Sequence, residues 1–193
     1  MQARIALTAL LAGLALNTAA TELRVVPGGS IAQAIAQAQP GDTVLIDLWA
    51  KKNVPGGIYY DITWVGYIGA TPPSAYVKIF DTVVRARDAA IAFLTDRFAK
   101  NRPCAGWEVD EVCRNVVKTA GYGRHFVHRT GHSIGEEVHG NGGNIDNLET
   151  KDVRQLMPGC CFSIEPGIYL PEFGFRTEID VLLTETGPEV TTL

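Results

Sequence analysis

The sequence lacks the signatures of several common protein classes. Its four cysteines form no Cys-x-x-Cys pair, so the ligand spacing of a zinc finger is absent. No stripe of lysine and arginine with interleaved aromatic residues occurs, and the net charge is −4, which argues against nucleic acid as a partner. No apolar run is long enough for a membrane-spanning helix. Histidine is scarce as well, because the chain has only four and the first is His125.

The residues that are present indicate a globular chain with one core. Of the 193 residues 46% are hydrophobic and 20% are charged, and this length supports one domain. Apolar residues at helical spacing predict helices over 75–99 and 106–120. Apolar runs bounded by glycine, proline and asparagine predict strands over 43–49, 57–66, 124–128, 162–168, 174–184 and 189–192.

The first twenty residues differ from the rest in composition. A short basic start is followed by an apolar run over 5–16 and by small residues up to Ala20. This is the three-part layout of a secretory signal peptide, so we predict that residues 1–20 are one and that the protein is periplasmic or secreted. The alternative is an ordinary helix, which segments rich in alanine and leucine readily form, in a cytoplasmic protein.

Residues 21–44 form a second atypical segment, ahead of a main domain over 45–193. Their pattern, V-x-P-G-G-S-I followed by P-G-D-T-V, resembles the opening of exported right-handed β-helix proteins. Too little of the pattern follows to build several coils, so a periplasmic β-helix accessory protein is the weakest of the functional hypotheses.

Four carboxylates and one imidazole dominate the main domain. Each lies in a short apolar or glycine-flanked segment that predicts a strand or a strand end. Carboxylates in apolar runs are costly unless positive charge meets them, and two divalent cations would balance the four negative charges. Oxygen ligands with one imidazole suit Mn²⁺, Fe²⁺, Co²⁺ or Zn²⁺. The five candidate ligands are Asp47, Asp61, His132, Glu165 and Glu178.

The order and context of these residues resemble the pita-bread metallopeptidase family, which includes methionine aminopeptidase, Xaa-Pro aminopeptidase and Xaa-Pro dipeptidase. The resemblance runs from about Asp42 to Leu193 and is strongest in HRTGHSIG (128–135), SIEPGIY (163–169) and FRTE (175–178). The positions of His128 and Arg176 favour the Xaa-Pro branch. The resemblance implies an α/β (α+β) pita-bread fold with a curved antiparallel sheet flanked by helices, whose N-terminal half is incomplete here.

The resemblance also implies roles for single residues. The five candidate ligands would hold two ions, Mn²⁺ first among them. Glu165 would also accept a proton from the attacking water, and His139 would stabilise charge at the scissile carbonyl. His128, His139 and Arg176 would line the substrate site, with Arg176 holding a neighbouring carboxylate. Without the resemblance, His139 would be interpreted as a surface histidine, His128 as a strand-end residue and Arg176 as part of an exposed salt bridge.

These expectations together predict a dinuclear metal-dependent aminopeptidase. It would hydrolyse the N-terminal bond of short peptides, with proline after that bond, by means of a metal-bridging hydroxide. The sequence departs from the family in having no histidine upstream of Asp47 and little of the first half-domain. The alternative is therefore a catalytically impaired homologue that binds peptides or proteins as a scaffold. An incomplete sheet has an exposed edge, so a homodimer is a further expectation.

Overall fold

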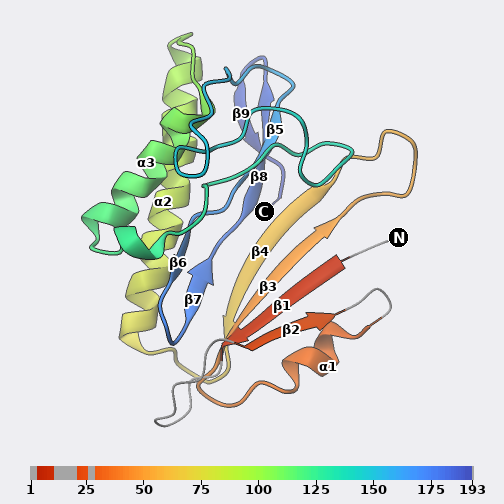
Figure 1. Ribbon diagram of the computed structural model, residues 1–193, viewed down its shortest axis with the longest axis vertical. Helices are drawn as coiled ribbons and strands as arrows, with labels where there is room; N and C mark the ends of the chain where they lie inside the picture. Colours follow the sequence, from red (N-terminus) through yellow and green to blue (C-terminus); the bar gives the residue numbers. More distant parts are fainter. Residues whose placement is uncertain (1–3, 11–20, 26–28, 193) are drawn as a thin grey trace.

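The N-terminal part of the molecule is an antiparallel sheet with one short helix (Figure 1). The computed structural model describes residues 4–10, 21–25 and 29–192. The elements of this part are β1 (Arg4–Leu10), β2 (Thr21–Val25), α1 (Ile31–Ile35), β3 (Thr43–Ala50) and β4 (Tyr60–Tyr67). The strand order is β2-β1-β3-β4, so β1 pairs antiparallel with both β2 and β3.

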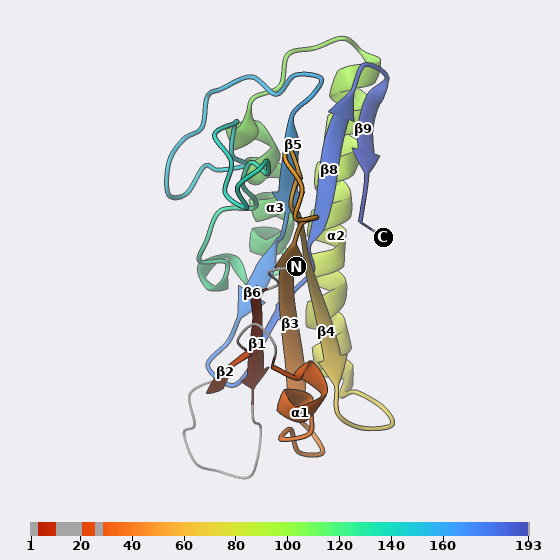
Figure 2. The same ribbon diagram turned by 90° about the vertical axis from the view of Figure 1, so that its right-hand side faces the viewer.

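Two long helices, α2 (Ser74–Ala99) and α3 (Gly106–Thr119), lie on one side of the strands (Figures 1 and 2). On α2, Val83, Ala86, Ala90 and Leu94 recur every three or four residues and are fully buried, so one face of the helix enters the core. Gly121 follows α3 with a φ of 91°, the left-handed conformation that commonly ends a helix. Both predicted helices are confirmed within one residue at each end.

The C-terminal part consists of short strands that pack against these helices. A single 3₁₀ turn, η1 (Gly123–His125), comes first in the chain. The strands are β5 (Cys161–Ile164), β6 (Gly167–Tyr169), β7 (Gly174–Arg176), β8 (Ile179–Thr184) and β9 (Gly187–Val190). One sheet has the order β5-β8-β9, and β6 pairs with β7. An isolated antiparallel bridge between Thr63 and Glu178 joins β4 to the start of β8. The two parts of the molecule therefore meet at two residues of the candidate site.

Three strand predictions were wrong in their detail. The segment 124–128 contains the end of the 3₁₀ turn and no strand. The predicted strand 162–168 is interrupted at Glu165 and Pro166, where proline has no amide to pair, and 174–184 is interrupted at Thr177 and Glu178. Each interruption includes a candidate ligand, Glu165 in the first and Glu178 in the second.

The resemblance of residues 21–44 to a β-helix is not supported. A β-helix stacks its strands in parallel, whereas β2 pairs antiparallel with β1, and α1 follows at Ile31. The alternative prediction of a helix near the N-terminus does not hold for residues 4–10, which form β1. The remainder of the predicted signal peptide, residues 1–3 and 11–20, lies outside the described residues.

Candidate metal centre

All the predicted site residues line one cavity of about 450 Å³. It opens between the β3–β4 sheet and the loops that precede β5. Four further residues complete the wall: Trp49, Arg129, Val138 and Glu149. The predicted residues that line the cavity are Asp47, Asp61, His128, His132, His139, Glu165, Arg176 and Glu178.

The β3–β4 pairing brings the two aspartates to one face of the sheet. Asp47 lies opposite Thr63, and Asp61 lies opposite Trp49. Opposite residues in an antiparallel pair point to the same face, and so do residues two apart along a strand, so both carboxylates project into the cavity. The β3–β4 hairpin therefore unites the two aspartates. Asp61 is buried, and its Oδ1 atom has no hydrogen-bond partner among the described residues.

The imidazole of His132 is oriented by its own backbone. Nδ1 lies 3.1 Å from the carbonyl oxygen of Ser133, which can only accept, so Nδ1 carries the proton of this bond. Nε2 then faces the cavity, 3.5 Å from Asp61 Oδ2 and 3.5 Å from Glu165 Oε1. A backbone carbonyl that fixes the tautomer in this way leaves the other ring nitrogen available as a metal ligand.

Two hydroxyl groups orient the glutamates. Ser163 accepts a hydrogen bond from the amide of His132 at 3.0 Å and donates one to Glu165 Oε1 at 3.1 Å. Thr63 donates to Glu178 Oε2 at 2.6 Å and accepts from Arg176 Nε at 2.9 Å. Each carboxylate is thereby held in place by a hydroxyl group that also hydrogen-bonds to a neighbouring site residue, His132 or Arg176. These hydroxyls are supports of the kind that metal ligands commonly have.

With only protein groups present, the site disfavours the ionised form of its carboxylic acids. Burial raises the pKa of Glu178 well above its usual range, and the charges of Glu165 and Asp61 raise it further. Burial also raises the pKa of Glu165 and of Asp47, against the opposing effect of Arg176. These shifts have one physical cause: several carboxylates share a space with too little water and too little positive charge.

The imidazole of His132 shows the opposite response. Burial disfavours its charged form, but the Asp61 carboxylate and the charge of Glu165 outweigh burial and raise its pKa. The site therefore attracts positive charge at the point between these three groups. A divalent cation placed there would supply that charge without a proton.

The donor set fits divalent metal ions. One ligand atom from each of Asp61, His132 and Glu178 lies within 4.8 Å of the other two. Two atoms are placed to coordinate a metal ion: Oδ1 of Asp61, which has no hydrogen-bond partner among the described residues, and Nε2 of His132, which faces the cavity. Asp47 and Glu165 line the same cavity, and Glu165 Oε1 lies 3.5 Å from His132 Nε2. The five predicted ligands are therefore brought together, with three in direct proximity and two adjacent.

Arg176 is the cation that neutralises part of this cluster. Its guanidinium donates one hydrogen bond to Asp47 Oδ2 and another to Thr63, and its charge lowers the pKa of Glu165 and Glu178. The prediction that Arg176 holds a neighbouring carboxylate is therefore met by Asp47. Among the described hydrogen bonds, Arg176 contacts this carboxylate through a single nitrogen, Nη2.

Two histidines line the cavity beside the cluster. His128 Nε2 lies 2.8 Å from the Tyr169 hydroxyl, and burial lowers the pKa of His128 to about 4, so its ring is neutral near pH 7. The ring of His139 meets that of His132 edge to face at 4.3 Å between centroids. Burial and the charge of His132 lower the pKa of His139. Its ring is exposed, as for a surface histidine, yet it borders the cavity.

Sequence reasoning missed the supporting residues Thr63, Ser163, Tyr169 and Asp180. Asp180 is the most notable, because it is buried and accepts a hydrogen bond from the Asp61 amide at 2.9 Å. Its position in the apolar run IDVLL resembles that of the predicted ligands, and the same argument on buried carboxylates would have found it. The hydroxyls carried no comparable signal, since serine and threonine are common in strands.

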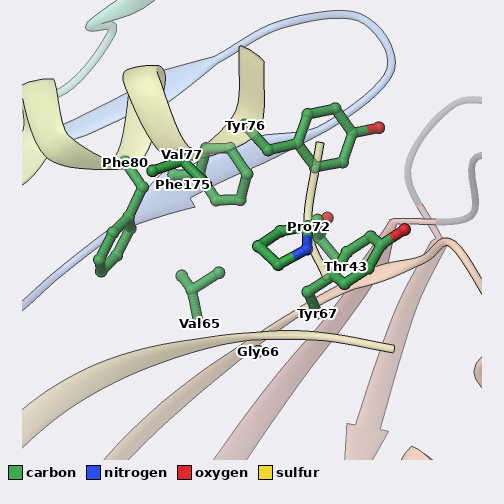
Figure 3. A pocket seen from close by; sticks show the side chains of 9 residues that line it. All are labelled: Thr43, Val65, Gly66, Tyr67, Pro72, Tyr76, Val77, Phe80 and Phe175. Carbon is green, nitrogen blue, oxygen red and sulfur yellow. The ribbon is translucent and has the colours of Figure 1, made fainter. Parts of the chain in front are cut away.

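A second cavity of about 220 Å³ lies at the opposite end of β4 (Figure 3). The side chains of Tyr67, Pro72, Tyr76 and Phe175 surround it, together with Val65. It contains no carboxylate, imidazole or thiol, so nothing in its lining supports catalysis or metal binding.

The fold and the site define a metallopeptidase of the pita-bread class. The chain belongs to metallopeptidase family M24, whose sequence profile matches residues 16–185. That match includes all of the atypical segment 21–44, which is a further reason to set the β-helix resemblance aside.

Several relatives are named Xaa-Pro dipeptidases. The chain is 45% identical over 150 residues to a Xaa-Pro dipeptidase of Lactobacillus delbrueckii subsp. lactis, covering 77% of this chain and 37% of the relative. It is 34% identical over 148 residues to a Xaa-Pro dipeptidase of Pyrococcus furiosus, covering 76% and 38%. The chain therefore spans well under half the length of these curated relatives.

Solved structures show the same relationship. The dipeptidase PepE from Mycobacterium ulcerans superposes with a TM-score of 0.69 at 35% identity, covering 81% of this chain and 39% of that one. The prolidase from Pyrococcus furiosus superposes with a TM-score of 0.64 at 29% identity, covering 89% and 43%. Among the described residues of the chain, no helix combines the length and the apolar character that crossing a membrane requires.

Proposed function

We propose that this chain is a dinuclear metal-dependent aminopeptidase that hydrolyses the N-terminal bond of short peptides with proline after that bond. The observation that carries the proposal is the convergence of all five candidate ligands on one cavity, with His132 Nε2 at 3.5 Å from both Asp61 and Glu165. The names of the Xaa-Pro dipeptidase relatives support the choice of substrate.

The ligand set would hold two divalent ions, of which Mn²⁺ is our first choice and Co²⁺, Fe²⁺ and Zn²⁺ are alternatives. Two such ions activate water and polarise a carbonyl group. Asp47, Asp61 and Glu178 contribute carboxylate oxygens, while His132 and Glu165 contribute from the facing loops. Neutralisation by the ions would lower the raised pKa values of the carboxyl groups, so metal binding would release protons.

The protein groups around the ligands handle the proton and the substrate. Glu165 would take up the proton of the attacking water and return it to the leaving amine, because its carboxylate lies at the ligand cluster, 3.5 Å from His132 Nε2. Neutral His139 donates a hydrogen bond to the carbonyl oxygen, on which negative charge develops in the transition state. His128, fixed by Tyr169, shapes the wall beside the substrate.

The central test compares Glu165→Gln with Glu172→Gln, a matched change at an exposed glutamate. Hydrolysis of a Xaa-Pro dipeptide and a Xaa-Pro tripeptide is measured with added Mn²⁺ and again after chelation. We expect wild type and Glu172→Gln to turn over substrate only with metal, and Glu165→Gln to be inactive. Unchanged turnover in Glu165→Gln would refute the role of Glu165.

The competing function is a peptide-binding scaffold, the alternative that the sequence leaves open. A scaffold would bind the Xaa-Pro peptide without any metal-dependent turnover. The convergence of every candidate ligand favours the enzyme, because a scaffold has no need for four carboxylates in one cavity.

We also propose export to the periplasm or medium, with a cytoplasmic protein as the alternative. Sequencing of the protein N-terminus in separate cell fractions decides between them: export predicts a start near Thr21. Cleavage there would remove β1 and leave β2 and β3 without their shared partner. We further propose a homodimer, since β2 is an edge strand; light scattering that gives only a monomeric mass would contradict it.

A further inference from the structure

The three histidines of the candidate site lie on one long segment without regular strands. It runs from Phe126 to Asn147 and contains His128, His132 and His139. Such a segment has few backbone pairings of its own, so something else must hold it where its side chains can act. The contacts of α3 with this segment show what holds it.

One buried carboxylate contacts both ends of the segment. Asp110 of α3 is fully buried and accepts three hydrogen bonds. Its Oδ1 atom accepts from the amide of Thr130 at 2.9 Å, and its Oδ2 atom accepts from the amide of Asn147 at 2.8 Å. The third donor is Arg114 Nε at 2.6 Å, one helical turn further along α3.

The guanidinium of Arg114 extends this contact to the start of the segment. It donates to the carbonyl oxygen of Phe126 at 3.1 Å and to that of His128, and it lies 4.4 Å from the centroid of the Phe126 ring. Glu111 adds a contact at the far end, where it accepts from the Asn147 side chain at 2.8 Å. Four backbone groups of the segment are thus held by one ion pair.

Thr130 connects the Asp110–Arg114 ion pair to the candidate metal centre. The amide of Thr130 is held by Asp110, while the carbonyl oxygen of Thr130 accepts from the amide of Glu165 at 2.7 Å. His132 lies two residues further along the chain. Thr130 therefore links the position of Asp110 to two candidate ligands, Glu165 through its carbonyl oxygen and His132 through the chain.

We propose that Asp110 and Arg114 are a positioning pair that fixes the histidine segment, so that His132 and Glu165 are preorganised for metal binding. The inference rests on the proposed function for its consequence, though the pair itself can be tested without metal. Neither residue lines the cavity, so the pair acts through the backbone and takes no part in the chemistry. Breaking a buried, hydrogen-bonded pair leaves uncompensated groups and frees the segment.

The test uses Asp110→Asn, with Glu108→Gln as the matched control. Glu108 is on the same helix and forms an ion pair with Arg97 of α2 at 2.5 Å, and its carboxylate also accepts from the amide of Ala105. Among the described hydrogen bonds, its side chain has none with the histidine segment. A purely structural role for Asp110 predicts that both variants lose stability and that neither changes the metal site.

Two readouts separate these possibilities. In the metal-free protein, amide hydrogen exchange at Thr130, Asn147 and Glu165 should quicken at least about tenfold in Asp110→Asn and stay unchanged in Glu108→Gln. The dissociation constant for Co²⁺, followed by its visible absorption, should rise roughly 10- to 100-fold in Asp110→Asn alone. Arg114→Lys retains the positive charge but loses the planar guanidinium group with its several hydrogen-bond donors. This change should quicken amide hydrogen exchange over 126–130.

The proposal is overturned if exchange in Asp110→Asn matches that in the control. It is equally overturned if exchange quickens while the Co²⁺ affinity stays at the wild-type value, because the segment would then be held for some other reason. If wild type itself binds no Co²⁺, the proposed function fails. The exchange comparison then decides separately whether the ion pair holds the segment.

Discussion

Asp180 should make the metal-free protein less stable as the pH rises. In the folded protein burial raises its pKa to about 7, with the charge of Asp61 as a further cause and the hydrogen bond from the Asp61 amide in opposition. In the unfolded chain the value returns to 3.8. Between these two pH values the folded state holds a proton that the unfolded state has lost. The free energy of unfolding therefore falls as the pH rises through this window.

The size of the effect follows from the shift. A difference of about three pH units at about 1.4 kcal/mol per unit gives about 4 kcal/mol, reached near pH 7 and absent below pH 4. Asp180 is 1% exposed, so solvent screens this cost little. Asp180→Asn has the shape of the protonated carboxyl and can still accept from the Asp61 amide, so it should not show this loss.

The assay is urea unfolding of both proteins with a chelator at intervals from pH 4.5 to 8. The difference between the two unfolding free energies isolates Asp180, since the neighbouring carboxylates are common to both. We expect Asp180→Asn to be more stable by about 1 kcal/mol at pH 4.5 and by about 4 kcal/mol at pH 7.5. A difference that stays constant with pH, or that favours wild type above pH 7, would refute the reasoning. Saturating Mn²⁺ should shrink the difference, because the ions neutralise the cluster.

Three further changes test other parts of the site. Thr63→Val removes the hydroxyl between Glu178 and Arg176, so Co²⁺ affinity should fall roughly 10- to 100-fold in a titration while the circular dichroism spectrum is retained. His139→Asn should lower kcat on a Xaa-Pro dipeptide about 100-fold with unchanged metal content; lost metal would instead make His139 a support of the ligands. Gly131→Ala would place a Cβ atom 1.9 Å from the Ser163 carbonyl oxygen, so thermal unfolding should show a loss of roughly 1–3 kcal/mol, and an unchanged Tm would contradict that close approach.

The elements that depend on local periodicity were predictable from the sequence. The apolar stripe that includes Leu94 fixes α2, and the glycine at 121 fixes the end of α3, because both signals act within a few residues. The segment 124–128 misled the prediction, since its aromatic and β-branched residues favour a strand while the chain there forms a 3₁₀ turn. Tertiary contacts such as that of Arg114 with Phe126 decide its conformation.

The candidate ligands were also predictable, for a different reason. An acidic residue in an apolar run is conspicuous, so Asp61 and Glu178 can be identified without a structure. Their supports are not conspicuous: Thr63 is a normal strand residue, and only the β4–β8 bridge reveals that it touches Glu178. Asp110 resembles any helical aspartate, and the role of its carboxylate depends on a loop twenty residues away. Long-range pairing of this kind leaves no mark on local spacing.

The candidate site is assembled from two separate parts of the chain, so it becomes complete only late in folding. Asp47 and Asp61 come from the β3–β4 hairpin, whereas His132, Glu165 and Glu178 come from the chain beyond α3. A partly synthesised or half-folded chain therefore carries an incomplete set of candidate ligands. Under the proposed function, such a chain would not hold both ions tightly, so peptide cleavage would begin only after the two parts have docked, and folding intermediates would not cleave peptides prematurely.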